Sequence, residues 1–168
     1  MKIHIIGSVG SGKSTLGKRL SAEMGIPVYE LDNVVWQRNE NGDIRNSPEV
    51  RDSKFHRIID QPEWIIEGVH HTWTTRGFQE ADCIIFLDTP IMVRNWRIFK
   101  RFTVQKLGFK KGNYKQTWTM LKRTYKWNYQ FEKTSKPEIL KMLKPHQEKL
   151  KILENNTYTK EFTHEIRI

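Results

Sequence analysis

Nine residues near the start of the chain have the composition of a loop that binds phosphate. Residues 7–15 read GSVGSGKST, and Gly7, Gly12, Lys13 and Ser14 match the pattern GxxxxGKS/T. Small residues let backbone N–H groups turn inward around a phosphate, and the lysine and the hydroxyl add a cation and a Mg²⁺ ligand. We therefore expect the whole loop to bind the triphosphate of ATP or GTP: Gly7, Ser8, Val9, Gly10, Ser11, Gly12, Lys13, Ser14 and Thr15.

The residues on either side of this loop decide between a phosphate cradle and an ordinary glycine-rich turn. KIHII at 2–6 is short and rich in β-branched residues, which predicts a buried strand. After the loop, Leu16, Leu20 and Met24 recur four apart before Gly25, which predicts a helix that begins at Lys13. Because a phosphate-binding loop needs a strand before it and a helix after it, the context favours the cradle.

Four further short strands are predicted. They are VYEL at 28–31, WIIEGV at 64–69, CIIFLD at 83–88 and LKIL at 150–153. The third and fourth strands of the chain are continuously apolar, as strands covered by helices on both faces are. Since helical segments separate most of the strands, we expect an α/β fold with a mostly parallel five-stranded sheet in a three-layer α/β/α sandwich.

The helical segments divide the chain into a core and two appendages. Ser47 and Pro48 begin a helix that ends before Pro62, inside a segment at 33–61 that we interpret as an acceptor-binding insert. Further helices are expected at 90–107, 114–133 and 137–150. Gly108 and Gly112 flank a short basic loop, so residues from about 94 to 115 are interpreted as a small lid. At 168 residues, we expect residues 1–168 to form a single domain.

The ordered segments resemble the nucleoside-monophosphate-kinase-like branch of small P-loop kinases, which includes adenylate and shikimate kinases. Within this branch they look most like the DNA-topology-modulation (FlaR-like) proteins. The resemblance rests on GSVGSGKST, YELDNVVW, WIIEGV and TTRGFQEADCIIFLDTPIMVRNWRIFKR, and it covers about residues 1–105. It implies phosphoryl transfer from ATP to a small acceptor in the presence of Mg²⁺.

The resemblance also implies roles for four residues outside the loop. Asp32, after the second strand, would orient the acceptor or accept its proton, although a helix-capping role is the alternative. Glu67 would hold a water of Mg²⁺ or act as a base, and we favour it over Asp88 for the metal. Arg97 and Arg101 match two lid arginines, of which one would stack on adenine and the other would clamp the transferring phosphoryl group.

Three further residues are candidates for the acceptor site. Trp36 would offer a flat wall to a ring, although packing in the core is the alternative. Arg76 and Arg94 would add to the anion site. The acidic-glycine pair at Glu67 is followed by Val69, His70 and His71, where adenylate kinases have Phe-Pro-Arg, so the usual mode of binding a nucleoside monophosphate is in doubt.

Composition limits the environment and the partners. The single cysteine, Cys83, rules out an intrachain disulfide, and no apolar run is long enough to span a membrane, so we expect a cytoplasmic protein with no membrane partner. The net charge of +10 is concentrated in residues 91–151, which contain 17 Lys and Arg against 3 Asp and Glu. Such a block suits the phosphates of a nucleotide or of a nucleic acid.

Three functions remain open at this stage. The favoured one is an ATP-dependent kinase with an unidentified acceptor. The alternative is a nucleotide-regulated protein that binds nucleic acid through the block at 91–151, where the aromatic residues between 114 and 131 would either stack on bases or pack the helix onto the sheet. A nucleotide-binding module without turnover is the third.

Overall fold

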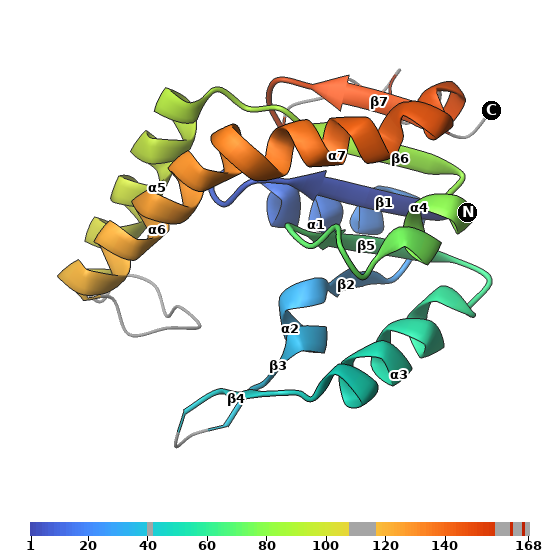
Figure 1. Cartoon of the computed structure of the whole chain (residues 1–168), viewed down its shortest axis with the longest axis horizontal. Helices are drawn as coiled ribbons and strands as arrows, with labels where there is room; N and C mark the ends of the chain where they lie inside the picture. Colours follow the sequence, from blue (N-terminus) through green and yellow to red (C-terminus); the bar gives the residue numbers. More distant parts are fainter. Residues whose placement is uncertain (40–41, 108–116, 157–161, 163–165, 167–168) are drawn as a thin grey trace.

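A five-stranded parallel sheet forms the centre of the molecule in the computed structural model of the chain (Figure 1). The structure describes residues 1–39, 42–107, 117–156, 162 and 166. The strands are β1 (Lys2–Gly7), β2 (Val28–Glu30), β5 (Trp64–Gly68), β6 (Cys83–Leu87) and β7 (Leu150–Leu153), in the spatial order β2-β5-β1-β6-β7. All four strand pairings are parallel, so the predicted fold class and the five predicted strands are confirmed.

Helices cover both faces of this sheet. Successive side chains of its central strands point alternately into two apolar layers, one on each face. Ile3 and Ile5 of β1 pack on one face with α1 (Lys13–Met24), in the layer of Leu16 and Leu20. Ile6 packs on the other face with residues from α3 (Pro48–Ile59), α4 (Thr75–Glu80) and α7 (Lys136–Leu143). The result is the predicted three-layer sandwich.

A long helical segment follows the sheet's fourth strand in the chain. It begins with α5 (Ile91–Lys106) and continues, after residues outside the described part, with α6 (Trp118–Gln130). A π-helical turn, η1 (Phe131–Ser135), joins α6 to α7, so that the three run on as one bent helix in Figure 1. The predicted lid segment is helical at 94–106, whereas Gly108 and Gly112 lie outside the described residues.

Two predicted elements differ from the structure. Leu31 begins the short helix α2 (Leu31–Val35) instead of ending a strand, because β2 stops at Glu30, opposite Glu67. The predicted helix at 137–150 ends at Leu143 and continues as the 3-10 turn η2 (Lys144–Lys149), which contains Pro145. A small antiparallel pair of strands, β3 (Trp36–Gln37) and β4 (Ile44–Arg45), lies in the insert, where no strand was predicted.

Within the described residues, none of the helices is both long and apolar enough to cross a membrane.

Candidate active site

The predicted phosphate loop lies between β1 and α1, at the edge of the sheet where the parallel strands end. Gly12 is the N-cap residue of α1, with φ 100°, and no side chain caps the N-terminus of this helix. A Cβ at Gly10, which has φ 78°, would lie 2.9 Å from the carbonyl oxygen of Arg94. The loop therefore needs glycine at both positions, and the first amides of α1 are left for another hydrogen-bond acceptor such as a phosphate.

Lys13 is folded back over this loop. Its Nζ donates a hydrogen bond of 2.8 Å to the carbonyl oxygen of Ser8, and the side chain is buried. Burial lowers the pKa of Lys13, while the nearby carboxylates of Glu67 and Asp32 raise it. A cation that is shielded from water and close to two carboxylates is well placed to bind the anionic oxygens of a triphosphate.

Ser14 and Glu67 come together beside Lys13. The Ser14 hydroxyl donates a hydrogen bond of 2.6 Å to Oε1 of Glu67, which belongs to β5 and is 5% exposed. Burial raises the pKa of Glu67, and the charge of Lys13 and the hydrogen bond from Ser14 lower it. A hydroxyl and a buried carboxylate in contact are the oxygen ligands that Mg²⁺ accepts next to phosphates.

The described residues contain no group of three or more His, Cys, Asp and Glu side chains that could hold a metal ion by themselves. A magnesium ion at Ser14 and Glu67 would thus depend on phosphate oxygens and water for its remaining ligands. This is the usual form of a magnesium site in enzymes that transfer phosphoryl groups.

Asp32 and Arg101 face the loop from two other elements. Asp32 lies in the first turn of α2, and Nε2 of His70 is 3.5 Å from its Oδ1. The nearby imidazole of His70 holds the pKa of Asp32 below its usual value, and burial opposes this shift. Burial also lowers the pKa of Arg101, while Asp32 raises it. Asp32, Arg101 and Lys13 thus lie close enough to influence one another's charge.

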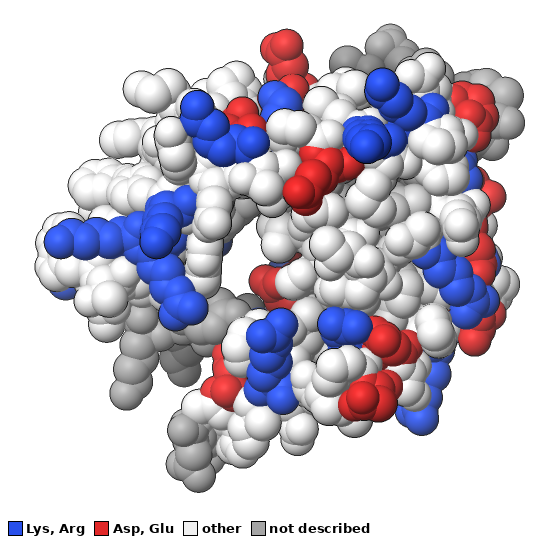
Figure 2. Space-filling view, viewed as in Figure 1, with Lys and Arg blue, Asp and Glu red and all other residues white. Residues whose placement is uncertain are grey.

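Figure 2 shows a hollow between the block that contains α5 and α6 and the part of the molecule that contains α2. Arg101 comes from α5 on one side, and Asp32 comes from α2 on the other. The structure therefore brings Lys13, Ser14, Glu67, Asp32 and Arg101 together around one cleft.

Arg97 contacts the phosphate loop directly. Its guanidinium donates hydrogen bonds to the carbonyl oxygens of Ser11 (2.7 Å) and Gly10 (3.4 Å) and to Oδ1 of Asn156 (2.9 Å). Asn156 lies over the loop, since a Cβ at Gly12 would be 2.7 Å from its Cγ. Thr15 is exposed in the first turn of α1, and Val9 packs against the apolar cluster between α5 and α6.

Two predicted residues are not brought to the cleft as expected. Arg76 bonds to Asp60 and Glu80, and Glu80 also pairs with Lys2 at the opposite edge of the sheet. Arg94 is 1% exposed, pairs with Glu132 and lies over the ring of Phe131, so it faces the protein interior.

Trp36 begins β3, and the guanidinium of Arg45 on β4 lies 5.9 Å from its ring. Asp88 pairs with Lys136 at 2.6 Å, which gives this carboxylate a structural partner on α7.

Several polar residues near the loop were not predicted. The hydroxyl of Ser8 donates a hydrogen bond of 2.9 Å to Oδ1 of Asn128 on α6, and Nδ2 of Asn128 donates one of 2.7 Å to Oδ1 of Asn95 on α5. Asn128 is fully buried. It shares the buried face of α6 with Leu121 and Thr124, and buried polar side chains such as these need hydrogen-bond partners.

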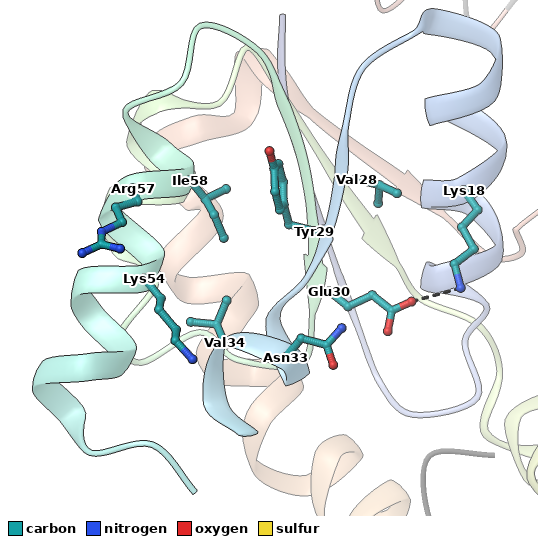
Figure 3. Close-up of a pocket in the computed structure, with 9 residues that line it drawn as sticks. All are labelled: Lys18, Val28, Tyr29, Glu30, Asn33, Val34, Lys54, Arg57 and Ile58. Atoms are coloured by element: carbon teal, nitrogen blue, oxygen red, sulfur yellow. Dashed lines mark ion pairs between the residues drawn. The ribbon is translucent and has the colours of Figure 1, made fainter. Parts of the chain in front are cut away.

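A separate pocket of about 520 Å³ lies along the outer edge of β2 (Figure 3). Lys18 of α1 closes it on one side through an ion pair of 3.1 Å with Glu30, and α3 borders it on the other. None of the predicted site residues lines this pocket; its lining is Lys18, Val28, Tyr29, Glu30, Asn33, Val34, Lys54, Arg57 and Ile58.

Two relatives match parts of the sequence. A shikimate kinase from Paracidovorax citrulli is 47% identical over 38 residues, which is 23% of this chain and 21% of that protein. The uncharacterised protein YqaC of Bacillus subtilis is 30% identical over 99 residues, which is 59% of this chain and 55% of that protein. The chain thus spans about a fifth and about half of these relatives' lengths. No family model matches the chain.

Solved structures match almost the whole chain. A shikimate kinase from Acinetobacter baumannii in complex with shikimate has a TM-score of 0.61 at 13% identity, covering 99% of this chain and 90% of that one. A gluconokinase from Sinorhizobium meliloti has a TM-score of 0.51 at 17% identity, covering 98% and 88%. On these matches and on its own sheet order, the chain has the P-loop α/β fold that shikimate kinase and gluconokinase share.

Proposed function

We propose that this protein transfers a phosphoryl group from ATP or GTP to a small acceptor with the help of Mg²⁺. One observation carries the proposal: the buried Lys13 and the bonded pair of Ser14 and Glu67 lie at the uncapped start of α1, close to Asp32 and Arg101. The first three residues suit a metal-bound triphosphate, and the other two suit an acceptor and a transferring group. The named activities of the structural neighbours support the same reaction class.

Each group has a defined task in this proposal. The amides at the start of α1 and Lys13 would bind the β and γ phosphates, and Ser14 and Glu67 would hold Mg²⁺, whose charge would offset that of the phosphates. Arg101 would neutralise charge on the transferring group, while Asp32 would orient the acceptor. Arg97 and Asn156, which lie over the loop, would contact the nucleotide on the side of the base.

The experiment is an assay of ADP formation with Mg²⁺ and a panel of nucleosides, nucleoside monophosphates, polyols and sugar acids. We expect one class of acceptor to raise turnover well above the rate with water alone. An Arg101→Met variant should lose most of that increase, whereas Arg76→Met, whose guanidinium pairs with Asp60 and Glu80, should retain it. No stimulation by any acceptor in the presence of bound nucleotide would favour a binding module without turnover.

A nucleic-acid-binding role is the second candidate, and one surface favours it. Residues 89–131 contain no Asp or Glu, and Figure 2 shows Lys and Arg side chains gathered over α6. On α6 the exposed ring of Trp127 lies 4.8 Å from the guanidinium of Arg123, an arrangement that suits stacking beside phosphates. The resemblance to DNA-topology-modulation proteins would fit the same nucleic-acid-binding role, and it remains a prediction.

Salt dependence tests this second role separately. If α6 binds single-stranded DNA, the affinity should fall by about 0.7 log units per log unit of salt for each phosphate that is neutralised. A Lys13→Met variant should bind DNA as well as the wild type does, because Lys13 is buried away from α6's exposed face. Weak binding at low salt that vanishes near physiological salt would leave the kinase as the only supported function.

A further inference from the structure

The pocket beside β2 occupies the open edge of the sheet (Figure 3). β2 is the last strand on this side, with β5 as its neighbour in the sheet. The N–H of Ile65 on β5 donates a hydrogen bond of 2.8 Å to the carbonyl oxygen of Pro27. In the same trans peptide the N–H of Val28 points in the opposite direction, toward the open edge. The pocket volume of about 520 Å³ lies within the range of small-molecule sites.

One part of this pocket is apolar. Tyr29 and Ile58 lie at the margin of one core layer, and Val28 lies at the margin of the other, so each of the three is only partly buried. Figure 3 shows the side chains of Ile58 and Tyr29 facing each other between α3 and β2. The hydroxyl of Tyr29 donates a hydrogen bond of 2.7 Å to Oε1 of Gln61, which leaves the face of the ring as a wall for an apolar group.

The cations of α3 that line the pocket have no carboxylate partner among the described residues. Asp52 pairs with its neighbour Arg51 at 2.7 Å, and Asp60 pairs with the arginine of α4 at 2.6 Å. Lys54 and Arg57 line the pocket, and neither one is in an ion pair within the described part of the chain. Their charges are therefore available to an anion.

The carboxylate that lines the pocket is already neutralised. Glu30 pairs with Lys18 of α1 at 3.1 Å, across the pocket from α3. In Figure 3 this ion pair lies at the same end of the pocket as Lys54 and the carboxamide of Asn33. Because Lys18 compensates Glu30 while Lys54 has no partner, this end of the pocket carries a surplus of positive charge.

We propose that the pocket beside β2 is a ligand site of its own, apart from the phosphate loop, and that it binds a small organic anion with an apolar body. The apolar body would lie against Tyr29 and Ile58, and the anionic group would lie near Lys54 and the amide of Asn33. A fully polar anion would leave the apolar walls in water, and a neutral apolar molecule would leave the cations without a partner. The inference goes beyond the proposed function and does not depend on it.

An NMR titration of the backbone amides of the full chain tests the ligand class. The probe is 3-phenylpropionate; acetate lacks its apolar body, and 3-phenylpropanol lacks its charge. We expect the probe to shift the amide signals of Val28 and Glu30 with a Kd of about 1 mM or lower, and the two partial ligands to bind at least about fivefold more weakly. Phenyl phosphate tests the other anionic head group, and the tighter of the two anions identifies the preferred one. Equal binding of 3-phenylpropanol and the probe, or no shifts at β2 with either anion, would overturn the inference.

Variants locate the bound anion. Lys54→Met keeps most of the apolar stem and should raise the Kd of 3-phenylpropionate about fivefold, the upper end for an ion pair that is partly exposed to water. Lys141→Met, which changes an exposed lysine of α7, should leave the Kd unchanged.

Lys13→Met should also bind the probe as the wild type does, because Lys13 belongs to the phosphate loop and does not line this pocket. An unchanged Kd in Lys54→Met, or a loss of binding in Lys13→Met, would overturn the inference. Failure of the wild type to bind ATP would instead contradict the proposed function and leave the site beside β2 standing.

Discussion

At the residue scale, the site depends on the carboxylate of Glu67, whose ionised form is destabilised by burial. Glu67 is almost fully buried, and its compensation comes from the hydroxyl of Ser14 and the charge of Lys13. The raised pKa of Glu67 means that burial disfavours its ionised form. An approaching cation would stabilise that form. A metal ion bound at this position would therefore gain from relieving an unfavourable buried charge.

This predicts how Glu67→Gln should behave. The wild type should bind ATP more tightly with Mg²⁺ than with EDTA, and the variant should lose about tenfold or more of that difference. Calorimetric titration with a non-hydrolysable ATP analogue measures it. The control is Glu63→Gln, since Glu63 is exposed just before β5 and pairs with the N-terminal amine. An undiminished effect of Mg²⁺ in Glu67→Gln would place the metal elsewhere.

At the element scale, α6 is tied to the phosphate loop although 120 residues separate Ser8 from Asn128. The side chain of Asn128 connects the loop to α5 as well, through Asn95. The position of the helix that follows the predicted lid is thus coupled to the conformation of the loop. A change in either one must break or rearrange this buried hydrogen-bond network.

Removing the link should cost both stability and nucleotide affinity. Asn128→Ala would leave the hydroxyl of Ser8 and the amide of Asn95 without their partner, which should lower the free energy of unfolding by about 1–3 kcal/mol. Urea unfolding measures this loss, and calorimetry measures nucleotide binding. Gln130→Ala, at the exposed end of the same helix, should change neither quantity. Equal stability of the two variants would mean that water replaces the network.

The sequence predicts those elements whose signal is local. Each of the five strands is a short apolar run, and the loop at 7–15 carries its own spacing, so both could be located from the residues alone. The strands β3 and β4 are each two residues long, which is too short for any periodicity to mark them. Pro145 limits α7, and only the structure shows that the chain then continues as a 3-10 turn.

The residues of the candidate site likewise divide into those with a local sequence signal and those without one. Ser14 and Glu67 follow from the motif and from the strand end, and the structure brings them into contact. Asn128 and Asn156 have no motif, and their place near the loop depends on how the helices pack. Arg76 and Arg94 were proposed from charge alone, which does not tell whether a guanidinium faces the cleft or an internal carboxylate.

At the scale of the whole molecule, a neutral histidine lies in the middle of the sheet. His4 of β1 is fully buried and stacks on Phe78 of α4 at 4.0 Å, and burial lowers its pKa to about 3. Below its ordinary pKa of 6.5, the unfolded chain binds a proton that the folded chain does not. The contribution of His4 to stability is thus complete above pH 6.5 and is lost progressively as the pH falls toward 3.

This gives a prediction for acid stability. Between about pH 6 and about pH 4, His4 should account for about 1.4 kcal/mol of unfolding free energy per pH unit. In His4→Leu this part of the slope should disappear, whatever the stability at neutral pH. Urea unfolding across the range measures it, with His56→Gln, an exposed histidine of α3, as the control. A slope in His4→Leu equal to that of the wild type would assign the acid sensitivity to other groups.

The whole account depends on a triphosphate binding at residues 7–15, and calorimetry of ATP with Mg²⁺ tests this most directly. The wild type should bind with a Kd below about 1 mM, within the range of substrate affinities that enzymes show. Lys13→Met should weaken binding at least about tenfold, whereas Lys18→Met, which changes an exposed lysine of the same helix, should bind as the wild type does. No heat of binding in the wild type, or equal affinity in Lys13→Met, would contradict the account.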